Sequence, residues 1–222
     1  VAEYANQRRL YIPIQAVPKM VISAFLSAED KNFYEHNGLD FGGIIRAGVL
    51  YVQTYGSGRR PQGASTITQQ VAKNFLLTNE VSLQRKIKEA LLSLKIERAY
   101  SKEKILELYL NEIYLGLGAY GIAAASLIYF DKSVHELTVP EAAYLASLPK
   151  APSQLNPFRA RDRAVERRNY VLDQMAVIGT IKAADAEKYK KEPLNVTTRP
   201  TGAHIFAAEY FAEEVRRWIY EK

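Results

Sequence analysis

Two glutamates in this sequence have opposite electrostatic settings, and both are suited to acid–base chemistry. Glu29 lies on an apolar helical stripe that runs to Phe33, where a carboxylate is normally excluded because burying a charge is costly. Desolvation raises the pKa of a carboxyl group towards neutrality, which suits proton transfer. Glu89 follows Arg85 and Lys86 at helical spacing, so we expect its pKa to be held low. Two carboxylates whose environments separate their pKa values are typical of an acid–base site.

Each glutamate also has a simpler structural interpretation. At the edge of its stripe, Glu29 would form an ion pair with His36 or a nearby lysine. Glu89 and Arg85 have the spacing of an ordinary ion pair on a helix surface. Periodicity alone leaves both interpretations open.

A polar segment, Gly-Ala-Ser-Thr-Ile-Thr-Gln-Gln, occupies residues 63–70 and follows a Gly- and Arg-rich loop. Thr66 and Gln69 have the spacing of a capping box, which predicts that a helix begins here. Free backbone N–H groups at a helix start, with hydroxyls and Lys73 one turn further on, suit an anion such as phosphate. An ordinary capping box is the alternative. The segment is not a Walker A loop, because the second glycine and the following Lys-Ser/Thr are missing.

Composition excludes several other kinds of chemistry. The chain has no cysteine, so disulfide scaffolds, thiolate metal sites and cysteine nucleophiles are ruled out. Its three histidines form no H-E-x-x-H motif, so we predict no histidine zinc site. Residues 101–104 and 147–150 both fit the S-x-x-K acylation motif, but the S-x-N and K-T-G segments that accompany it are absent. The net charge of +6 predicts an anionic partner, yet acidic residues interrupt every basic run and no nucleic-acid-binding motif is present.

The elements that must position these residues are mainly helices. Apolar residues recur at helical spacing and strand-like alternation is scarce, so the sequence predicts a mostly α-helical fold. The predicted helices cover residues 22–38, 66–75, 83–100, 106–117, 122–129, 139–148, 160–178 and 183–190, with a proline-bounded loop at 149–157. Residues 41–63 do not show this helical periodicity. Their first half is apolar with glycines, and their second half is a Gly-, Arg- and Gln-rich loop. Residues 197–204 predict a polar linker before an amphipathic piece at 206–218.

No stretch reaches the ~20 apolar residues that span a bilayer, and the N-terminus lacks the apolar region of a signal peptide. The chain begins without Met and ends within a helical pattern. We therefore interpret it as a fragment of a longer protein, with any membrane anchor outside it.

Five segments in register between Ile22 and Met175 resemble the motifs of the family 51 peptidoglycan glycosyltransferases. These are the transglycosylase domains of class A penicillin-binding proteins, and the likeness is to the 1A type. Residues 29–40 fit E-D-x-x-F-x-x-H-x-G-x-D, and residues 63–70 continue to a Lys-Asn pair at 73–74. The other three segments are Arg-Lys-x-x-Glu at 85–89, residues 105–116 and residues 140–157.

The resemblance implies a mostly α, lysozyme-like large helical lobe with a small membrane-associated jaw subdomain at about residues 40–62. The glycosyltransferase domain would cover residues 1–196, and residues 197–222 would be a linker and the start of the following region. The apolar residues 41–52 would then contact the membrane, which explains an otherwise odd apolar segment.

The activity that the resemblance implies is polymerisation of lipid II. The 4-hydroxyl of lipid II would attack the anomeric carbon of the growing glycan, inverting that centre and releasing undecaprenyl pyrophosphate. By resemblance, Glu29 is the general base, and Glu89 orients or stabilises the donor and its departing pyrophosphate. Further residues implied to bind the substrate or to support Glu29 are Asp30, Phe33, His36, Ser65, Thr66, Gln70, Lys73, Asn74, Arg85, Lys86, Tyr114, Lys150 and Ser153. Of these, Lys73, Arg85 and Lys150 would neutralise charge on the pyrophosphate.

The resemblance requires no cofactor and allows Mg2+ or another divalent cation at the pyrophosphate, although the sequence shows no dedicated metal ligands. The implied partners are lipid II, the growing glycan, moenomycin-type inhibitors, the membrane surface and a C-terminal transpeptidase domain, but no nucleic acid. The implied location is the outer, periplasmic face of the bacterial cytoplasmic membrane, with an N-terminal transmembrane anchor outside this chain. One departure is Val81, where many relatives have arginine; Arg59, Arg60 or Lys88 would have to replace that contact.

Two other functions compete with synthesis. A lysozyme-like muramidase or lytic transglycosylase would cleave the same glycan with a catalytic glutamate. It would need no cations for a pyrophosphate, so Lys73, Arg85 and Lys150 favour synthesis. The second alternative is a basic membrane- or nucleic-acid-binding module without catalysis, which the interrupted basic runs disfavour.

Overall fold

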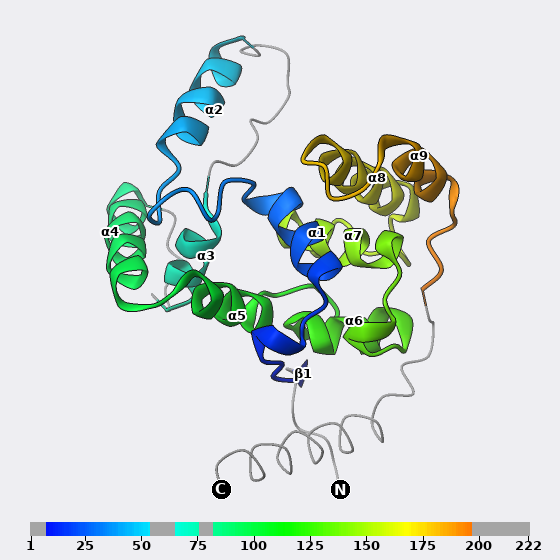
Figure 1. Cartoon of the computed structure of the whole chain (residues 1–222). Helices are drawn as coiled ribbons and strands as arrows, with labels where there is room; N and C mark the ends of the chain where they lie inside the picture. The colour runs from blue at the N-terminus through cyan, green and yellow to red at the C-terminus, as the bar shows by residue number, and fades with distance from the viewer. Residues whose placement is uncertain (1–7, 54–64, 76–81, 197–222) are drawn as a thin grey trace, which may run out of the picture. The chain divides into compact units, whose positions relative to one another are not determined.

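The computed structural model describes residues 8–53, 65–75 and 82–196, and these residues are mostly helical (Figure 1). The predicted mostly α fold class is therefore confirmed. Contacts divide the chain into two compact units, one of residues 1–28 and 110–222 and the other of residues 29–109. No helix within the described ranges combines the length and apolar character needed to span a membrane.

The first unit contains most of the predicted helices. Its elements are β1 (Arg8–Arg9), η1 (Ile14–Ala16), α1 (Lys19–Glu29, whose last residue belongs to the other unit), β2 (Ala119–Tyr120), α6 (Ile122–Phe130), η2 (Val134–Glu136), α7 (Val139–Ser147), η3 (Leu148–Lys150), α8 (Arg161–Val177) and α9 (Ala183–Lys191). β1 pairs in parallel with β2. From residue 122 onwards, the observed helices match the predicted ones to within a few residues.

The core of the first unit is built around α6 and α7. Every residue of α6 is buried, as its uninterrupted apolar sequence requires. The rings of Tyr129 and Phe130 meet the ring of Tyr144 edge to face, with centroids 5.5 and 6.1 Å apart. α7 begins at a capping box formed by Thr138 and Glu141. α8 packs against both α7 and α9 (Figure 1).

The second unit contains α2 (Phe41–Gln53), α3 (Ile67–Phe75), α4 (Leu83–Ala99) and most of α5 (Lys102–Glu112). α3 packs against α4. The capping box predicted at the start of α3 is confirmed. The backbone N–H of Gln69 donates to Thr66 Oγ1 at 3.1 Å, and the N–H of Thr66 donates to Gln69 Oε1 at 2.9 Å. Ser82 caps α4 by accepting the N–H of Arg85 at 3.1 Å.

The first predicted helix was too long, because α1 ends at Glu29 and does not continue towards Gly38. The carboxylate of Asp30 accepts the N–H of Ile67 at 2.9 Å, one of the donors that a helix start leaves unpaired. The chain then turns, with the N–H of Phe33 donating to the carbonyl of Asp30 at 3.2 Å. Phe33 is nevertheless fully buried. The apolar stripe therefore predicted burial correctly and the helix wrongly.

The fourth predicted helix was also too long, since α5 ends at Glu112. Gly116, Leu117 and Gly118 have φ values of 87°, 52° and 76°, which no right-handed helix allows. Leu117, expected on the apolar stripe, is therefore exposed.

The apolar residues 41–53, for which the sequence predicted no regular element, form α2. Asp40 begins this helix, because its Oδ1 accepts the N–H of Gly43 at 2.8 Å. The predicted loop at 149–157 begins within η3 and continues as turns. The Gly- and Arg-rich loop before residue 65, Val81, and the segments predicted at 197–204 and 206–218 lie outside the described residues.

Candidate active site

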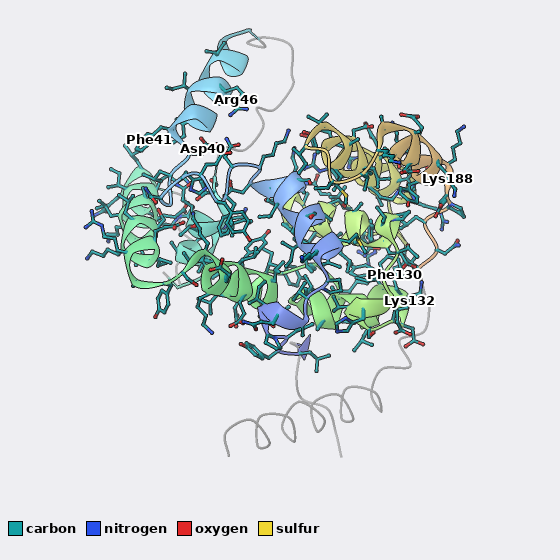
Figure 2. The ribbon with its side chains drawn as sticks, viewed as in Figure 1. Asp40, Phe41, Arg46, Phe130, Lys132 and Lys188 are labelled. Carbon is teal, nitrogen blue, oxygen red and sulfur yellow. The ribbon has the colours of Figure 1, made fainter. Side chains whose placement is uncertain are left out.

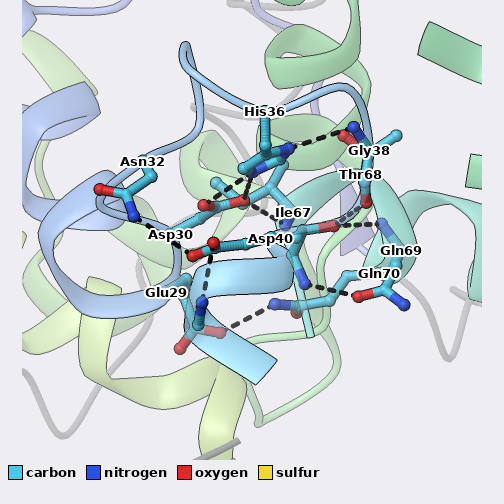
Figure 3. A network of polar contacts seen from close by, with 12 residues as sticks. Glu29, Asp30, Asn32, His36, Gly38, Asp40, Ile67, Thr68, Gln69 and Gln70 are labelled. Atoms are coloured by element: carbon cyan, nitrogen blue, oxygen red, sulfur yellow. Dashed lines mark hydrogen bonds and ion pairs between the residues drawn. The ribbon is translucent and has the colours of Figure 1, made fainter. Parts of the chain in front are cut away.

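The acidic pair at the end of α1 is divided between a buried and a partly exposed carboxylate, and Asp30 is the buried one. Both oxygens of Asp30 lie 3.0 Å from Nε2 of His36, and one also accepts the backbone N–H of Ile67 (Figure 3). The N–H of Gly38 donates to Nδ1 of His36 at 3.1 Å, so the ring carries its proton on Nε2 and donates it to Asp30. Asp30 therefore ties the turn after α1 to the start of α3.

Glu29, the proposed base, is held from α3. The amide nitrogen of Gln70 donates to Glu29 Oε2 at 2.9 Å (Figure 3). Tyr109 is buried nearby, and the pKa of its hydroxyl is raised well above the usual range by burial and, in addition, by the negative charges of Glu29 and Asp30. The carboxylate on the predicted apolar stripe is thus half-buried and oriented by Gln70.

Glu89 forms a second cluster between α3 and α4. It is 2% exposed and forms an ion pair with Lys86, whose Nζ also donates to Ser65 Oγ at 3.0 Å. The surface-pair interpretation of Glu89 with Arg85 was therefore wrong, because Glu89 is buried and pairs with Lys86. Nε of Arg85 is buried, and no described residue accepts a hydrogen bond from it.

The exposed polar residues of α3 follow Gln70 on the same face. Lys73 and Asn74 are exposed and lie three and four residues after Gln70, which places all three on one side of the helix. Thr66 is different, because it is buried and its hydroxyl donates to the carbonyl of Gly38 at 2.7 Å. That hydroxyl also accepts the capping hydrogen bond, so Thr66 positions the helix.

The other predicted site residues are divided between the two units. Phe33 is fully buried in the second unit, where it can support its neighbours but not contact a substrate. Tyr114, Lys150 and Ser153 belong to the first unit. Tyr114 is partly exposed and packs on Tyr120, with ring centroids 5.0 Å apart. Lys150 is exposed at the end of η3, and Ser153 is exposed in the turn that follows it.

Two residues that position this region were not predicted. Asp40 accepts hydrogen bonds from Asn32 Nδ2 at 3.3 Å and from the N–H of Gly43. Its position before an apolar run is an N-cap signal that could have been recognised. Lys102 donates to the carbonyl of His36 at 2.6 Å, and no local pattern could have revealed a contact between residues so far apart in the chain.

Within the described ranges, no group of three or more His, Asp or Glu side chains is arranged to hold a metal ion. The carboxylates described above bind lysine, amide and backbone donors instead.

Comparison with known proteins decides the family. A family model described as Transglycosylase matches residues 1–176. The chain belongs to the transglycosylase family. Penicillin-binding protein 1A of Rickettsia felis is 52% identical over 217 residues, which cover 98% of this chain and 27% of that protein. Penicillin-binding protein 1A of Escherichia coli is 45% identical over 222 residues, covering 100% of this chain and 26% of that protein.

A solved structure supports the same assignment. The 2.6 Å crystal structure of penicillin-binding protein 1A from Haemophilus influenzae matches 98% of this transglycosylase chain and 22% of its own, with a TM-score of 0.54 and 29% identity. The resemblance expected from the five motifs is thus confirmed. The transglycosylase chain spans about a quarter of the length of these relatives.

Proposed function

We propose that this transglycosylase domain polymerises lipid II into glycan strands. The 4-hydroxyl of an incoming lipid II attacks the anomeric carbon of the growing chain, the bond from that carbon to the pyrophosphate breaks, and the centre is inverted. The observation that carries the proposal is the hydrogen bond from Gln70 to Glu29. It holds a partly exposed carboxylate beside the face of α3 that also carries Lys73.

Glu29 is the general base in this reaction. A general base must come within hydrogen-bond reach of the proton that it removes, and Glu29 is the more accessible member of the acidic pair. Asp30 is unsuited, because both of its oxygens already accept hydrogen bonds inside the protein. Asp30 and His36 instead fix the backbone next to Glu29, while Gln70 orients its carboxylate.

The cations of α3 and α4 stabilise the leaving pyrophosphate. Negative charge grows on this group as the sugar bond breaks, and cations already in place lower the barrier without reorganisation. Lys73 is exposed, and the buried Nε of Arg85 would gain an acceptor from a phosphate oxygen. The ion pair with Glu89 holds Lys86 in position.

The remaining assignments rest on resemblance. Ser65, Thr66, Gln70 and Asn74 are assigned to sugar and phosphate oxygens, and Tyr114, Lys150 and Ser153 to the same substrate. For Thr66 the geometry supports positioning of α3 more strongly than contact with the substrate.

Membrane association belongs to the same proposal. Phe41, Ile44, Ile45 and Val49 form an exposed apolar stripe on α2, and Figure 2 shows Phe41 and Arg46 projecting from this helix. Such a stripe beside a cationic residue suits the surface of an anionic bilayer. We assign it to a jaw of about residues 40–62, within a domain of residues 1–196. An outer-face location, an N-terminal transmembrane anchor, a C-terminal transpeptidase domain and binding of moenomycin-type inhibitors are further parts of the proposal.

The test is to incubate the chain with fluorescent lipid II in detergent and to digest the product with a muramidase. Long labelled chains that the muramidase shortens are expected. Fragments released from preformed glycan, with no polymer from lipid II, would instead indicate a muramidase or lytic transglycosylase. The Glu29→Gln protein serves as the blank in both reactions.

A further inference from the structure

We infer that Lys102 is a positioning residue for Glu29, which it controls by holding the turn of residues 30–38 against α3 and α4. None of the hydrogen bonds of Lys102 described below is to a residue that we assign to the pyrophosphate. The inference rests on the proposed function, because it concerns how the proposed base is kept in place.

The side chain of Lys102 is held inside the second unit. It is the first residue of α5 and its side chain is 18% exposed. Its Nζ donates to the backbone carbonyl of His36 at 2.6 Å and to Glu97 Oε1 at 2.8 Å, and it lies 4.5 Å from the centroid of the Phe33 ring. An ammonium has three donors, and here protein groups surround most of it. Lys102 is therefore not an ordinary solvated lysine.

Its partner Glu97 extends the contact to α3. Glu97 Oε1 also accepts the hydroxyl of Thr68 at 2.6 Å, and the Glu97 side chain is only 6% exposed. Thr68 is fully buried in the first turn of α3. Lys102 thus neutralises a buried carboxylate that tethers the helix carrying Gln70. Removing the cation would leave that charge uncompensated.

The turn itself packs closely on α4. Gly38 has a φ of +92°, and a Cβ added there would lie 3.0 Å from the carbonyl oxygen of Ser93 and 3.1 Å from Cγ of Glu97. The carbonyl of Gly38 accepts the hydroxyl of Thr66. The turn is therefore held at Gly38 by α3 and α4, and at His36 by Lys102.

His36 and Asp30 connect these contacts to Glu29. The ring of His36 binds Asp30, which precedes the rest of the turn and directly follows Glu29 in the chain. Loosening the carbonyl of His36 would displace its ring, then Asp30, and with it Glu29 relative to Gln70. Because the base acts on the reacting hydroxyl while other residues bind the pyrophosphate, kcat should fall with little change in KM.

The experiment compares Lys102→Met and Lys102→Arg with Lys132→Met in the full chain. Lys132 is a matched control, because it forms a lysine–glutamate pair with Glu141, at 2.7 and 3.0 Å, in the other unit. We expect Lys102→Met to lower kcat for lipid II polymerisation by about tenfold or more, because small displacements of a catalytic group are costly. KM should stay within about twofold. Lys102→Arg should recover part of kcat, and Lys132→Met should keep it.

Amide hydrogen exchange gives a readout that does not need activity. Residues 30–38 should exchange faster in Lys102→Met than in the parent protein, with α8 unchanged. An unchanged kcat in folded Lys102→Met, an equal loss in Lys132→Met, or unaltered exchange in the turn would overturn the inference. If Lys102→Met does not fold, Glu97→Gln, which removes the charge but keeps an acceptor, decides on the same measurements. A parent chain that makes no glycan would contradict the proposed function, while the exchange data would still decide whether Lys102 holds the turn.

Discussion

Glu29 and Asp30 are adjacent in the chain, but their carboxylates retain different capacities for chemistry. Asp30 accepts a histidine N–H and a backbone N–H and is buried. Glu29 accepts an amide N–H from Gln70 and stays partly exposed. A buried and fully engaged carboxylate serves structure, whereas an oriented and accessible one is suited to proton transfer.

The substitution Glu29→Gln tests this difference. It removes the ability to accept a proton while keeping the size of the side chain, so we expect glycan synthesis to fall by about 10²–10⁴-fold. The melting temperature should change little, because Glu29 is partly exposed. The rate is measured with fluorescent lipid II, and Glu35→Gln, an exposed acid in the following turn, should leave it unchanged. A Glu29→Gln protein that still makes long glycan would remove Glu29 from the mechanism.

The cations are tested by separating donor use from acceptor use. Lys73→Ala and Arg85→Ala should each weaken use of the donor more than use of the acceptor, because only the donor loses its pyrophosphate in the transition state. Initial rates measured with donor and acceptor varied independently give both constants. Lys95→Ala, on the exposed side of α4, is the control. Equal losses for the two substrates would contradict the pyrophosphate assignment.

At the scale of elements, the start of α3 combines a helix cap with the geometry of the site. Thr66→Val would remove the capping acceptor and the hydrogen bond to Gly38, so we expect a loss of about 1–2 kcal/mol in the free energy of unfolding. Activity should fall as well, since Gln70 lies one turn further along. Thr138→Val removes the cap of α7 and should lower stability alone. Urea unfolding and glycan synthesis are the two measurements, and equal activity losses in both variants would count against a special role for this cap.

The exposed stripe of α2 is tested with lipid vesicles. Ile45→Glu places a charge where Ile45 is 68% exposed, so it should weaken cosedimentation with vesicles of phosphatidylcholine and phosphatidylglycerol by severalfold. Val177→Glu changes an apolar residue of similar exposure, 73%, on α8 and should have little effect. Equal binding of Ile45→Glu and the parent chain would argue against membrane contact through α2.

Most helices could be predicted from the sequence because their signals are local. The capping box of Thr66 and Gln69 and the apolar run of α6 are complete within one segment. The end of α1 depends on a bond between Asp30 and Ile67, which are far apart in sequence, so periodicity alone continued the helix wrongly. Local patterns indicated Glu29 and Lys73 as candidates, and family resemblance gave them and Gln70 their roles. Neither gave any sign of Lys102, whose partners come from distant segments.

At the scale of the whole molecule, two arginines of α8 hold the end of α9 and the chain that follows it. Arg168 is fully buried and donates to the carbonyls of Lys190 and Glu192 at 3.0 and 2.8 Å, and burial lowers the pKa of its guanidinium. Arg161 donates to the carbonyl of Leu194 at 2.8 Å. These bonds agree with a domain that extends to about residue 196.

Two shortened chains test that boundary. A chain ending at residue 196 keeps every one of these carbonyls and should melt close to the parent. A chain ending at residue 188 leaves the buried guanidinium of Arg168 without its two backbone acceptors and with only Asn169 Oδ1, which should cost about 1–3 kcal/mol or more. Thermal unfolding by circular dichroism compares them, and identical melting temperatures would contradict the boundary.

The carbonyls that Arg168 and Arg161 reach are set by how many residues separate α8 from the end of α9. An insertion or deletion there would bring other backbone groups opposite the two guanidinium groups. The buried charge of Arg168 would then lose its carbonyl acceptors. A hybrid protein that joins this transglycosylase domain to a foreign partner should therefore place its splice site after Val196, so that the carbonyls of Lys190, Glu192 and Leu194 keep their positions in the chain.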